Sequence, residues 1–105
     1  MIQFKYTPNN GIINLMRQEF IDINHDYLYG FLDEGYANQL NRCILYLCCD
    51  YTYKDGNHIY RNPIVIVAPN NVKALETYTT VTNGRQGFIH SELVRNCKDL
   101  EVETI

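Results

Sequence analysis

Residues 43–82 read CILYLCCDYTYKDGNHIYRNPIVIVAPNNVKALETYTTVT, and this stretch contains the strongest signals of secondary structure in the chain. Two apolar, tyrosine-rich runs flank the residues KDGN at positions 54–57, and Asp-Gly between two such runs is a strong signal for a β-hairpin. The second run ends at PNN, residues 69–71, after which the apolar residues take the spacing of a helix. The stretch therefore predicts a β-hairpin, with a four-residue loop, that leads into a short helix.

The two runs of the hairpin differ in their expected place in the sheet. The first run is apolar on both faces, as is typical of an interior strand. One face carries Cys43, Leu45, Leu47, Cys49, Tyr51 and Tyr53, and the other carries Ile44, Tyr46, Cys48, Asp50 and Thr52. The second run contains Pro63, which cannot donate to a strand ladder and so requires an edge, a bulge or a strand start.

The helix after the hairpin has recognisable ends. Asn70 or Asn71 is expected to cap its N-terminus, because a short polar side chain there accepts a hydrogen bond from the first turn. Asn83 and Gly84 are expected to end it. The buried stripe between them is predicted to consist of Val72, Leu75 and Tyr78 or Thr79.

The segments on either side of this stretch complete the element order. Residues 2–6 alternate as in a half-buried strand, and residues 88–94 predict a last strand. A helix follows the first strand, with an apolar face of Ile12, Leu15, Met16, Phe20, Ile23 and Tyr27. Residues 27–40 predict a second helical piece or an aromatic-rich connection, because Gly30 and Gly35 weaken a single long helix.

The resulting order, β-α-β-β-α-β, predicts an α+β fold in a single domain of residues 1–105. This is the order of the ferredoxin-like, or split βαβ, sandwich, an antiparallel sheet with both helices on one face. The extra length between Met16 and Leu40 would enlarge the first helical crossover. The acidic tail at residues 98–105 is expected to fray.

Composition excludes several classes of protein. The chain is 46% hydrophobic and 20% charged, as in an ordinary globular domain. No apolar run approaches the ~20 residues of a membrane span, and the N-terminus shows no secretory signal, so we expect a cytoplasmic protein that binds no membrane. The formal net charge of −3 opposes direct binding to nucleic acid, whose phosphates select basic patches.

Acidic residues gather in the first half of the chain. Residues 19–34 contain five acids and no Lys or Arg. With the neighbouring tyrosines, which offer rigid contact area, they predict a surface for a basic protein partner. Its residues are Glu19, Asp22, Asp26, Tyr27, Tyr29, Asp33, Glu34 and Tyr36. The same acids are also typical of a solvated helix face that binds nothing.

Motifs for nucleotides, cofactors or metals are absent from the sequence. The run GRQG at residues 84–87 lacks the spacing of a phosphate loop, and neither GxSxG nor HExxH occurs. The four cysteines, Cys43, Cys48, Cys49 and Cys97, form no CxxC pair, so they are interpreted as buried free thiols. We therefore expect no cofactor and no metal.

His90, Ser91 and Glu92 on the last strand, with Asp50 and His58 across the hairpin, are the only cluster of proton-transfer residues. His90 and Glu92 share a face of an ideal strand and would then form a general acid-base pair in a small enzyme. The alternative is an exposed polar face. An RNA-stacking platform of Phe4, Tyr6, Tyr51, Tyr53 and Tyr60 would also fit a ferredoxin-like sheet, but the net charge opposes it.

The run IVIVAPNNVKALETYTTVTN, Ile64 to Asn83, resembles segments in small phage-encoded accessory proteins. The short, acidic, Tyr- and Asn-rich chain is similar in kind to the anti-CRISPR and other anti-defence proteins. That resemblance implies a non-catalytic inhibitor that blocks a host protein or protein–nucleic acid complex in the host cytoplasm. The remaining alternatives are the small enzyme and a homodimer or larger homo-oligomer that pairs through sheet edges.

Overall fold

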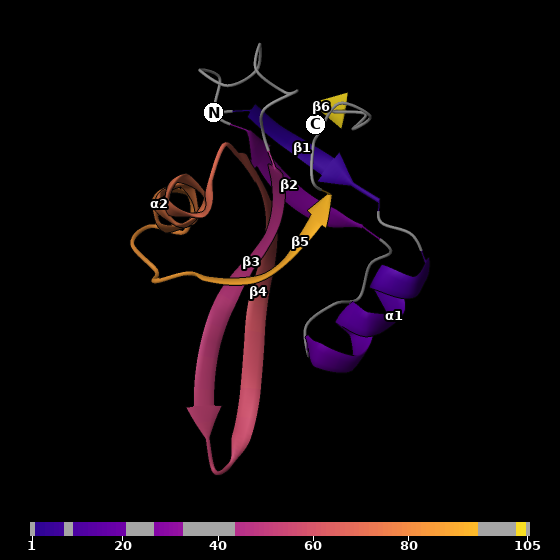
Figure 1. Cartoon of the computed structure of the whole chain (residues 1–105), viewed down its shortest axis with the longest axis vertical. Helices are drawn as coiled ribbons and strands as arrows, with labels where there is room; N and C mark the ends of the chain where they lie inside the picture. Colours follow the sequence, from indigo (N-terminus) through magenta and orange to yellow (C-terminus); the bar gives the residue numbers. More distant parts are fainter. Residues whose placement is uncertain (1, 8–9, 21–26, 33–43, 95–102, 105) are drawn as a thin grey trace.

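The computed structural model describes residues 2–7, 10–20, 27–32, 44–94 and 103–104. These residues form β1 (Ile2–Tyr6), α1 (Asn10–Glu19), β2 (Leu28–Leu32), β3 (Ile44–Lys54), β4 (Asn57–Ala68), α2 (Asn71–Val81), β5 (Phe88–Val94) and β6 (Glu103–Thr104). The strands make one mixed sheet in the order β5-β3-β4-β2-β1-β6 (Figure 1). The predicted α+β class is therefore confirmed. No helix in the described part of the chain is long and apolar enough to cross a lipid bilayer.

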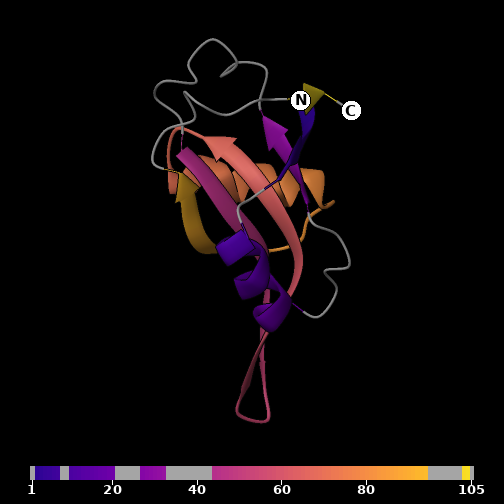
Figure 2. The same cartoon turned by 90° about the vertical axis from the view of Figure 1, so that its right-hand side faces the viewer.

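The predicted hairpin is formed by β3 and β4, and its loop is tighter than expected. Lys54 and Asn57 are the last cross-strand pair, so the turn consists of Asp55 and Gly56 alone. Their φ angles are +53° and +81°, as a type I′ turn requires, and glycine adopts such angles without steric cost. The hairpin projects beyond both helices (Figures 1 and 2).

Pro63 lies at a bulge, one of the three positions that the sequence allowed for it. Cys48 pairs with Ile64 and Asp50 pairs with Arg61, so Cys49 stands opposite two residues of β4. The extra residue beside the proline, Asn62, has a φ of +53°. The bulge separates the part of the hairpin in the core from the part that projects.

The α2 helix begins and ends where the sequence indicated. The Asn70 side chain accepts a hydrogen bond from the Lys73 amide at 2.9 Å, and Asn83 and Gly84 with positive φ follow the last turn. The predicted buried stripe was wrong except at Tyr78. Ala74 and Tyr78 are buried, Leu75 is partly buried, and Val72 and Thr79 are exposed. The helix thus meets the sheet through one small side chain, Ala74, and one large ring, Tyr78.

A strand replaces the second helical piece predicted in residues 27–40. β2 pairs antiparallel with β1 and parallel with β4. Gly30 lies opposite Phe4, and a Cβ atom at Gly30 would be 2.3 Å from Phe4 Cζ. The glycine therefore serves to receive an aromatic ring in the sheet, whereas we had expected it only to weaken a helix. Residues 33–40 lie outside the described residues.

The two helices cover opposite faces of the sheet, so the ferredoxin-like prediction was wrong in its layering. α1 buries Ile13 and Met16 against Leu45, Leu47 and the other large apolar residues of one cluster. α2 buries Ala74 and Tyr78 on the other face, against Tyr46, Cys48, Ile66 and Ala68. The parallel pairing of β2 with β4 also departs from the all-antiparallel sheet that we expected.

The first half of β3, Leu45 to Cys49, lies between the two helices and is buried on both faces, as predicted for an interior strand. Adjacent Cys48 and Cys49 belong to opposite clusters, and both are free thiols without solvent exposure. Burial raises the pKa of each thiol to about 12, and the neighbouring ionisable groups add to the rise. Cys43 and Cys97 lie outside the described residues.

Candidate functional site

Beyond Cys49 the hairpin continues past both helices, and its side chains on the α1 face are mostly aromatic. With rings from β5 and from the end of α1 they form a continuous row, which we call the aromatic strip. It consists of Phe20, Tyr51, Tyr53, His58, Tyr60, Phe88 and His90. Strand alternation places the β3 and β4 members on one face, because Tyr51 pairs with Tyr60 and Tyr53 pairs with His58.

Ring contacts connect the outer part of the strip. The Tyr51 ring stacks on Phe88 at a centroid distance of 5.1 Å and lies 5.5 Å from Tyr60. The Tyr51 hydroxyl oxygen lies 2.5 Å from Nδ1 of His58. The Tyr53 ring meets the His58 imidazole edge to face at a centroid distance of 5.2 Å. These spacings are typical of favourable aromatic pairs, so the outer rings hold one another in place.

The inner part of the strip joins the core. Tyr60 and His90 meet edge to face at 5.1 Å, and Phe20 lies 5.3 Å from His90 and 5.7 Å from Tyr60. Burial raises the pKa of the Tyr60 hydroxyl, and the Glu19 carboxylate raises it further, so this hydroxyl stays neutral.

Solvent exposure increases along the strip from the core toward the turn. Phe20 is 2% exposed, Tyr51 and Phe88 are 38% and 41% exposed, and Tyr53 is 63% exposed. Large exposed aromatic side chains on a rigid strand are common anchor residues in protein–protein interfaces. The outer rings of the strip are therefore exposed to solvent and at the same time held in place by their neighbours.

The His90 side chain links β5 to α1 through a contact with Glu19 that the sequence did not predict. Its Nε2 contacts the Glu19 carboxylate, and its Nδ1 lies 3.3 Å from the Ser91 hydroxyl oxygen. The His90 side chain is 12% exposed and that of Glu19 is 35% exposed. The arrangement tethers the end of α1 to the sheet.

The predicted pair of His90 and Glu92 is not formed, because a β-bulge changes the faces. Leu47 pairs with Ser91, Cys48 pairs with Ile89, and His90 is the extra residue between them. Glu92 pairs with Tyr46, which packs on the α2 face, whereas His90 contacts α1. The two side chains therefore lie on opposite sides of the sheet.

Three of the eight residues predicted for the acidic binding surface lie in the described part. Glu19 contacts His90, as above, and Tyr27 and Tyr29 meet edge to face at 5.6 Å beside β2. The Lys5 Nζ atom lies 4.1 Å from the Tyr27 ring centre. A hydrogen bond with Tyr27 raises the pKa of Tyr29, which is 43% exposed. Asp22, Asp26, Asp33, Glu34 and Tyr36 lie outside the described residues.

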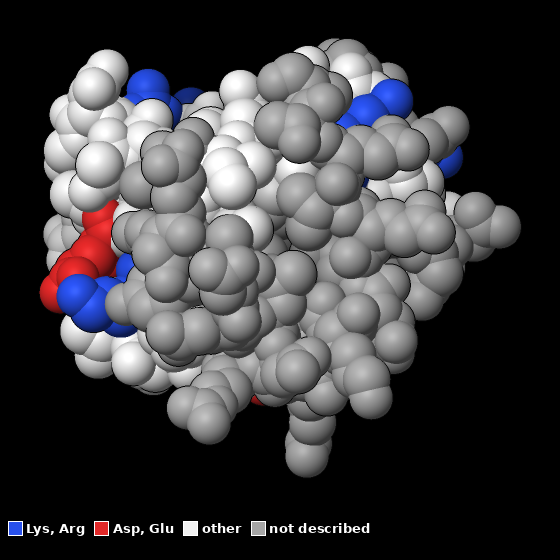
Figure 3. All heavy atoms as spheres, turned by 90° about the horizontal axis from the view of Figure 1, so that it is seen from above, with Lys and Arg blue, Asp and Glu red and all other residues white. Residues whose placement is uncertain are grey.

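On the end of the molecule that carries both termini, the acidic and basic atoms of the described residues lie in small separate groups (Figure 3). Glu19 is the one predicted acid in the described part, so the acidic surface stays a prediction. On α2 the Nζ atom of Lys73 and the Glu76 carboxylate form an ion pair at 3.2 Å. The RNA platform is not assembled as predicted, because Phe4 is fully buried with its ring against Gly30 of β2.

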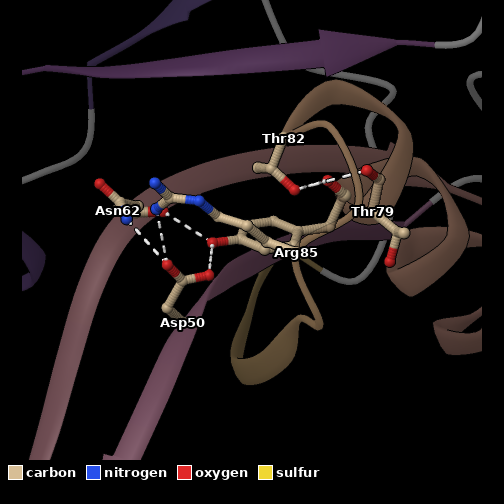
Figure 4. A network of polar contacts seen from close by, with 6 residues as sticks. Asp50, Asn62, Thr79, Thr82 and Arg85 are labelled. Atoms are coloured by element: carbon tan, nitrogen blue, oxygen red, sulfur yellow. Dashed lines mark hydrogen bonds and ion pairs between the residues drawn. The ribbon is translucent and has the colours of Figure 1, made fainter.

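The opposite face of the hairpin carries a polar network around Asp50 (Figure 4). Tyr78 donates its hydroxyl to Asp50 Oδ1 at 2.7 Å, and the Asn62 amide and Arg85 guanidinium each donate to Oδ2 at 2.8 Å. Partial burial opposes ionisation of Asp50, but these three hydrogen bonds and the Arg85 charge lower its pKa overall. Burial and the hydrogen bond to Asp50 raise the pKa of Tyr78. The network fixes α2 and the segment after it to the bulge.

No group of His, Cys, Asp and Glu side chains in the described residues has the arrangement of a metal site. Comparison with protein-family models gives no match, and comparisons with curated proteins and with solved structures give none either.

Proposed function

We propose that the chain is a non-catalytic protein-binding module whose contact surface is the aromatic strip. The observation that carries the proposal is the exposure of Tyr51, Tyr53 and Phe88 on a hairpin that projects beyond both helices. Rings that stabilise the hairpin would be partly exposed as well, but Tyr53 at the outer end of the strip is 63% exposed and contributes little to covering the sheet.

The charge of the chain favours a protein over a nucleic acid as the partner. Aromatic rings on a sheet also stack on bases, but such sites combine the rings with a basic groove that follows the phosphates. The formal net charge is −3, and Glu19 lies at the inner end of the strip. A partner surface with apolar pockets and a basic rim would complement both properties.

The narrower form of the proposal is a phage-type inhibitor that blocks a host defence complex in the host cytoplasm. Its support is the sequence resemblance alone. Stoichiometric blocking requires only a rigid surface that occupies the partner's working face, and the strip offers one.

Affinity capture with matched variants tests the binding surface. The purified chain would be immobilised and exposed to a bacterial host lysate, beside the double variant Tyr53→Ala/Phe88→Ala and the control Val72→Ala. Val72 is 62% exposed on α2, away from the strip. We expect the wild type and the control to capture the same protein in stoichiometric amounts and the double variant to lose it. Equal capture by all three forms would contradict the assignment of the strip.

A second candidate function is acid-base catalysis, favoured by the contacts that His90 makes with Glu19 and Ser91. A histidine oriented by a carboxylate and adjacent to a hydroxyl has the geometry of a general base. On this hypothesis His90→Ala would abolish hydrolysis of small esters. Glu92→Ala would preserve it, because Glu92 lies on the other face. Absence of hydrolysis by the wild type would eliminate this candidate.

A further inference from the structure

The β3 strand has an exposed edge beside the turn. β5 begins at Phe88, which pairs with Cys49, and β3 continues for the residues Asp50 to Lys54. Within the described ranges, no strand pairs with that side of residues 50–54 (Figure 1). The matching edge of β4 is partly occupied, because Phe20 forms a bridge with Tyr60. An unpaired strand edge is a template for another strand.

The register of the hairpin determines which backbone groups point outward. In a hairpin with a two-residue turn, the pair next to the turn is hydrogen-bonded, and here that pair is Lys54 and Asn57. Alternation then directs the amides and carbonyls of Asp50, Thr52 and Lys54 toward β4. Those of Tyr51 and Tyr53 point away from β4 into the open edge.

The backbone groups and charges of this edge complement those of the same edge in an antiparallel second copy. We propose that a second copy of the chain pairs antiparallel with β3, with Thr52 opposite Thr52 of the second copy. Tyr51 then lies opposite Tyr53 of the second copy, so their outward amides and carbonyls exchange hydrogen bonds. Asp50 lies opposite Lys54 of the second copy, so at both ends of the pairing an ammonium group approaches a carboxylate that already accepts from Arg85.

Other registers satisfy fewer of these groups. A shift of two residues in one direction would require the outward groups of Cys49, which β5 already uses through Phe88. The same shift in the other direction would bring the turn residue Asp55, with its positive φ, into the ladder. The register centred on Thr52 is the one that pairs both outward residues and both charges.

The open edge begins where β5 starts. A hollow of about 290 Å³ lined by Tyr51, Gln86, Gly87 and Phe88 lies at this start of β5. The two-fold axis would stand perpendicular to the continuous sheet, so both aromatic strips would lie on the same face. Dimerisation would therefore join them into one longer surface.

A charge variant tests the pairing in the intact chain. We expect wild-type light scattering to rise with concentration from the monomer mass of 12.3 kDa toward twice that value. Lys54→Glu should weaken the dimer about tenfold, since it sets two acids opposite each other at both ends of the pairing. Lys73→Glu, the same change on α2, should leave the dimer unaltered. A wild type that stays monomeric up to about 1 mM would overturn the proposal, as would equal dimerisation of Lys54→Glu.

A cysteine variant tests the register independently of charge. Directly opposed residues in a non-hydrogen-bonded pair have Cα atoms about 4.5 Å apart, within the range of a disulfide. Under mild oxidation Thr52→Cys should give a covalent dimer, whereas Thr80→Cys on the exposed side of α2 should not. Failure of Thr52→Cys to cross-link while the wild type dimerises would refute this register. Circular dichroism of each variant establishes that it is folded, and neither test depends on the proposed partner.

Discussion

Tyr78→Phe removes one hydroxyl from the network around Asp50 and leaves the ring in place. The ring is fully buried, and the hydroxyl donates to Asp50 Oδ1 at 2.7 Å and to the Asn62 carbonyl oxygen at 3.3 Å. A hydrogen bond to a charged acceptor contributes about 1.5–3 kcal/mol to stability. The Asp50 side chain is 25% exposed, and water can replace part of the lost bond, so we expect a loss of about 1–2 kcal/mol.

The assay is thermal and urea denaturation at pH 7, followed by circular dichroism. For a domain of this size the expected loss lowers the melting temperature by roughly 5–10 °C. Tyr53→Phe is the matched control, because the Tyr53 side chain is 63% exposed, and it should change stability by less than about 0.5 kcal/mol. The variant Asp50→Asn and the double variant complete a double-mutant cycle. If the two residues are coupled, the stability losses of the two single variants add up to more than the stability loss of the double variant.

The same variant has a defined dependence on pH. The pKa of Asp50 is lowered in the folded state from its ordinary value of 3.8. Its contribution to stability is thus complete above the unfolded-state pKa and is lost as the pH falls through the folded-state pKa. The penalty of Tyr78→Phe should therefore shrink below about pH 4. A penalty that is absent at pH 7, or additive with Asp50→Asn, would refute the assignment of the network as a stabilising contact.

Three further predictions concern the core and the acid stability of the fold. Gly30→Ala should destabilise the chain by about 1–3 kcal/mol in urea denaturation, because its Cβ would overlap the Phe4 ring, and Phe4→Leu should restore part of the loss. Cys48 and Cys49 should resist maleimide at pH 7.5 in the native state and react in urea, as peptide mass spectrometry would show. Below pH 4 the wild type should lose stability more steeply than Asp50→Asn, in urea titrations at each pH.

The hairpin and the ends of α2 could be predicted because their determinants are local in sequence. Asp55-Gly56 specifies the turn through its backbone angles, and Asn70 specifies the helix start through one hydrogen bond. Pro63 required an irregular position, and the bulge supplies it. Each of these signals acts within about four residues, so it can be recognised in the sequence without knowing the rest of the fold.

β2 could not be predicted because its stability depends on distant partners. The sequence LYGFL contains a central glycine, which weakens a helix or a strand considered alone. Here Phe4 covers the glycine from the neighbouring strand, and Val65 pairs with it on the other side. The same limit applies to the layering, because amphipathic patterns show which face of a helix is buried but not which face of the sheet it covers.

The candidate site was predicted only in its residue types. Sequence alternation correctly grouped Tyr51 with Tyr53, but Glu19 and His90 are separated by 71 positions and meet only because α1 ends beside β5. The bulge at His90 inverts the expected relation with Glu92. A register shift of one residue exchanges the faces of a strand, and nothing in the local pattern of β5 marks it.

The extent of the two helices explains why one half of the hairpin is buried and the other half is exposed. α1 and α2 cover β3 only as far as Cys49, and the bulge beside Pro63 marks the same level on β4. Beyond this level no helix among the described residues covers either face of the sheet, so the side chains of the hairpin stabilise it through contacts with one another and with Arg85. On one face Asp50 does so through hydrogen bonds to α2 and Arg85, and on the other face the rings around Tyr51 stack on one another.

Aromatic rings that replace a missing layer are necessarily half exposed, and this links the stability of the hairpin to its proposed role. If the strip only maintained the hairpin, Tyr53 would contribute little, since its side chain lies 63% in solvent at the outer end. If the strip binds a partner, Tyr53 is its most accessible anchor. Tyr53→Ala should therefore change stability by less than about 1 kcal/mol, which a urea denaturation curve measures. A strong loss of binding without a loss of stability would assign the outer ring to contact rather than to the fold.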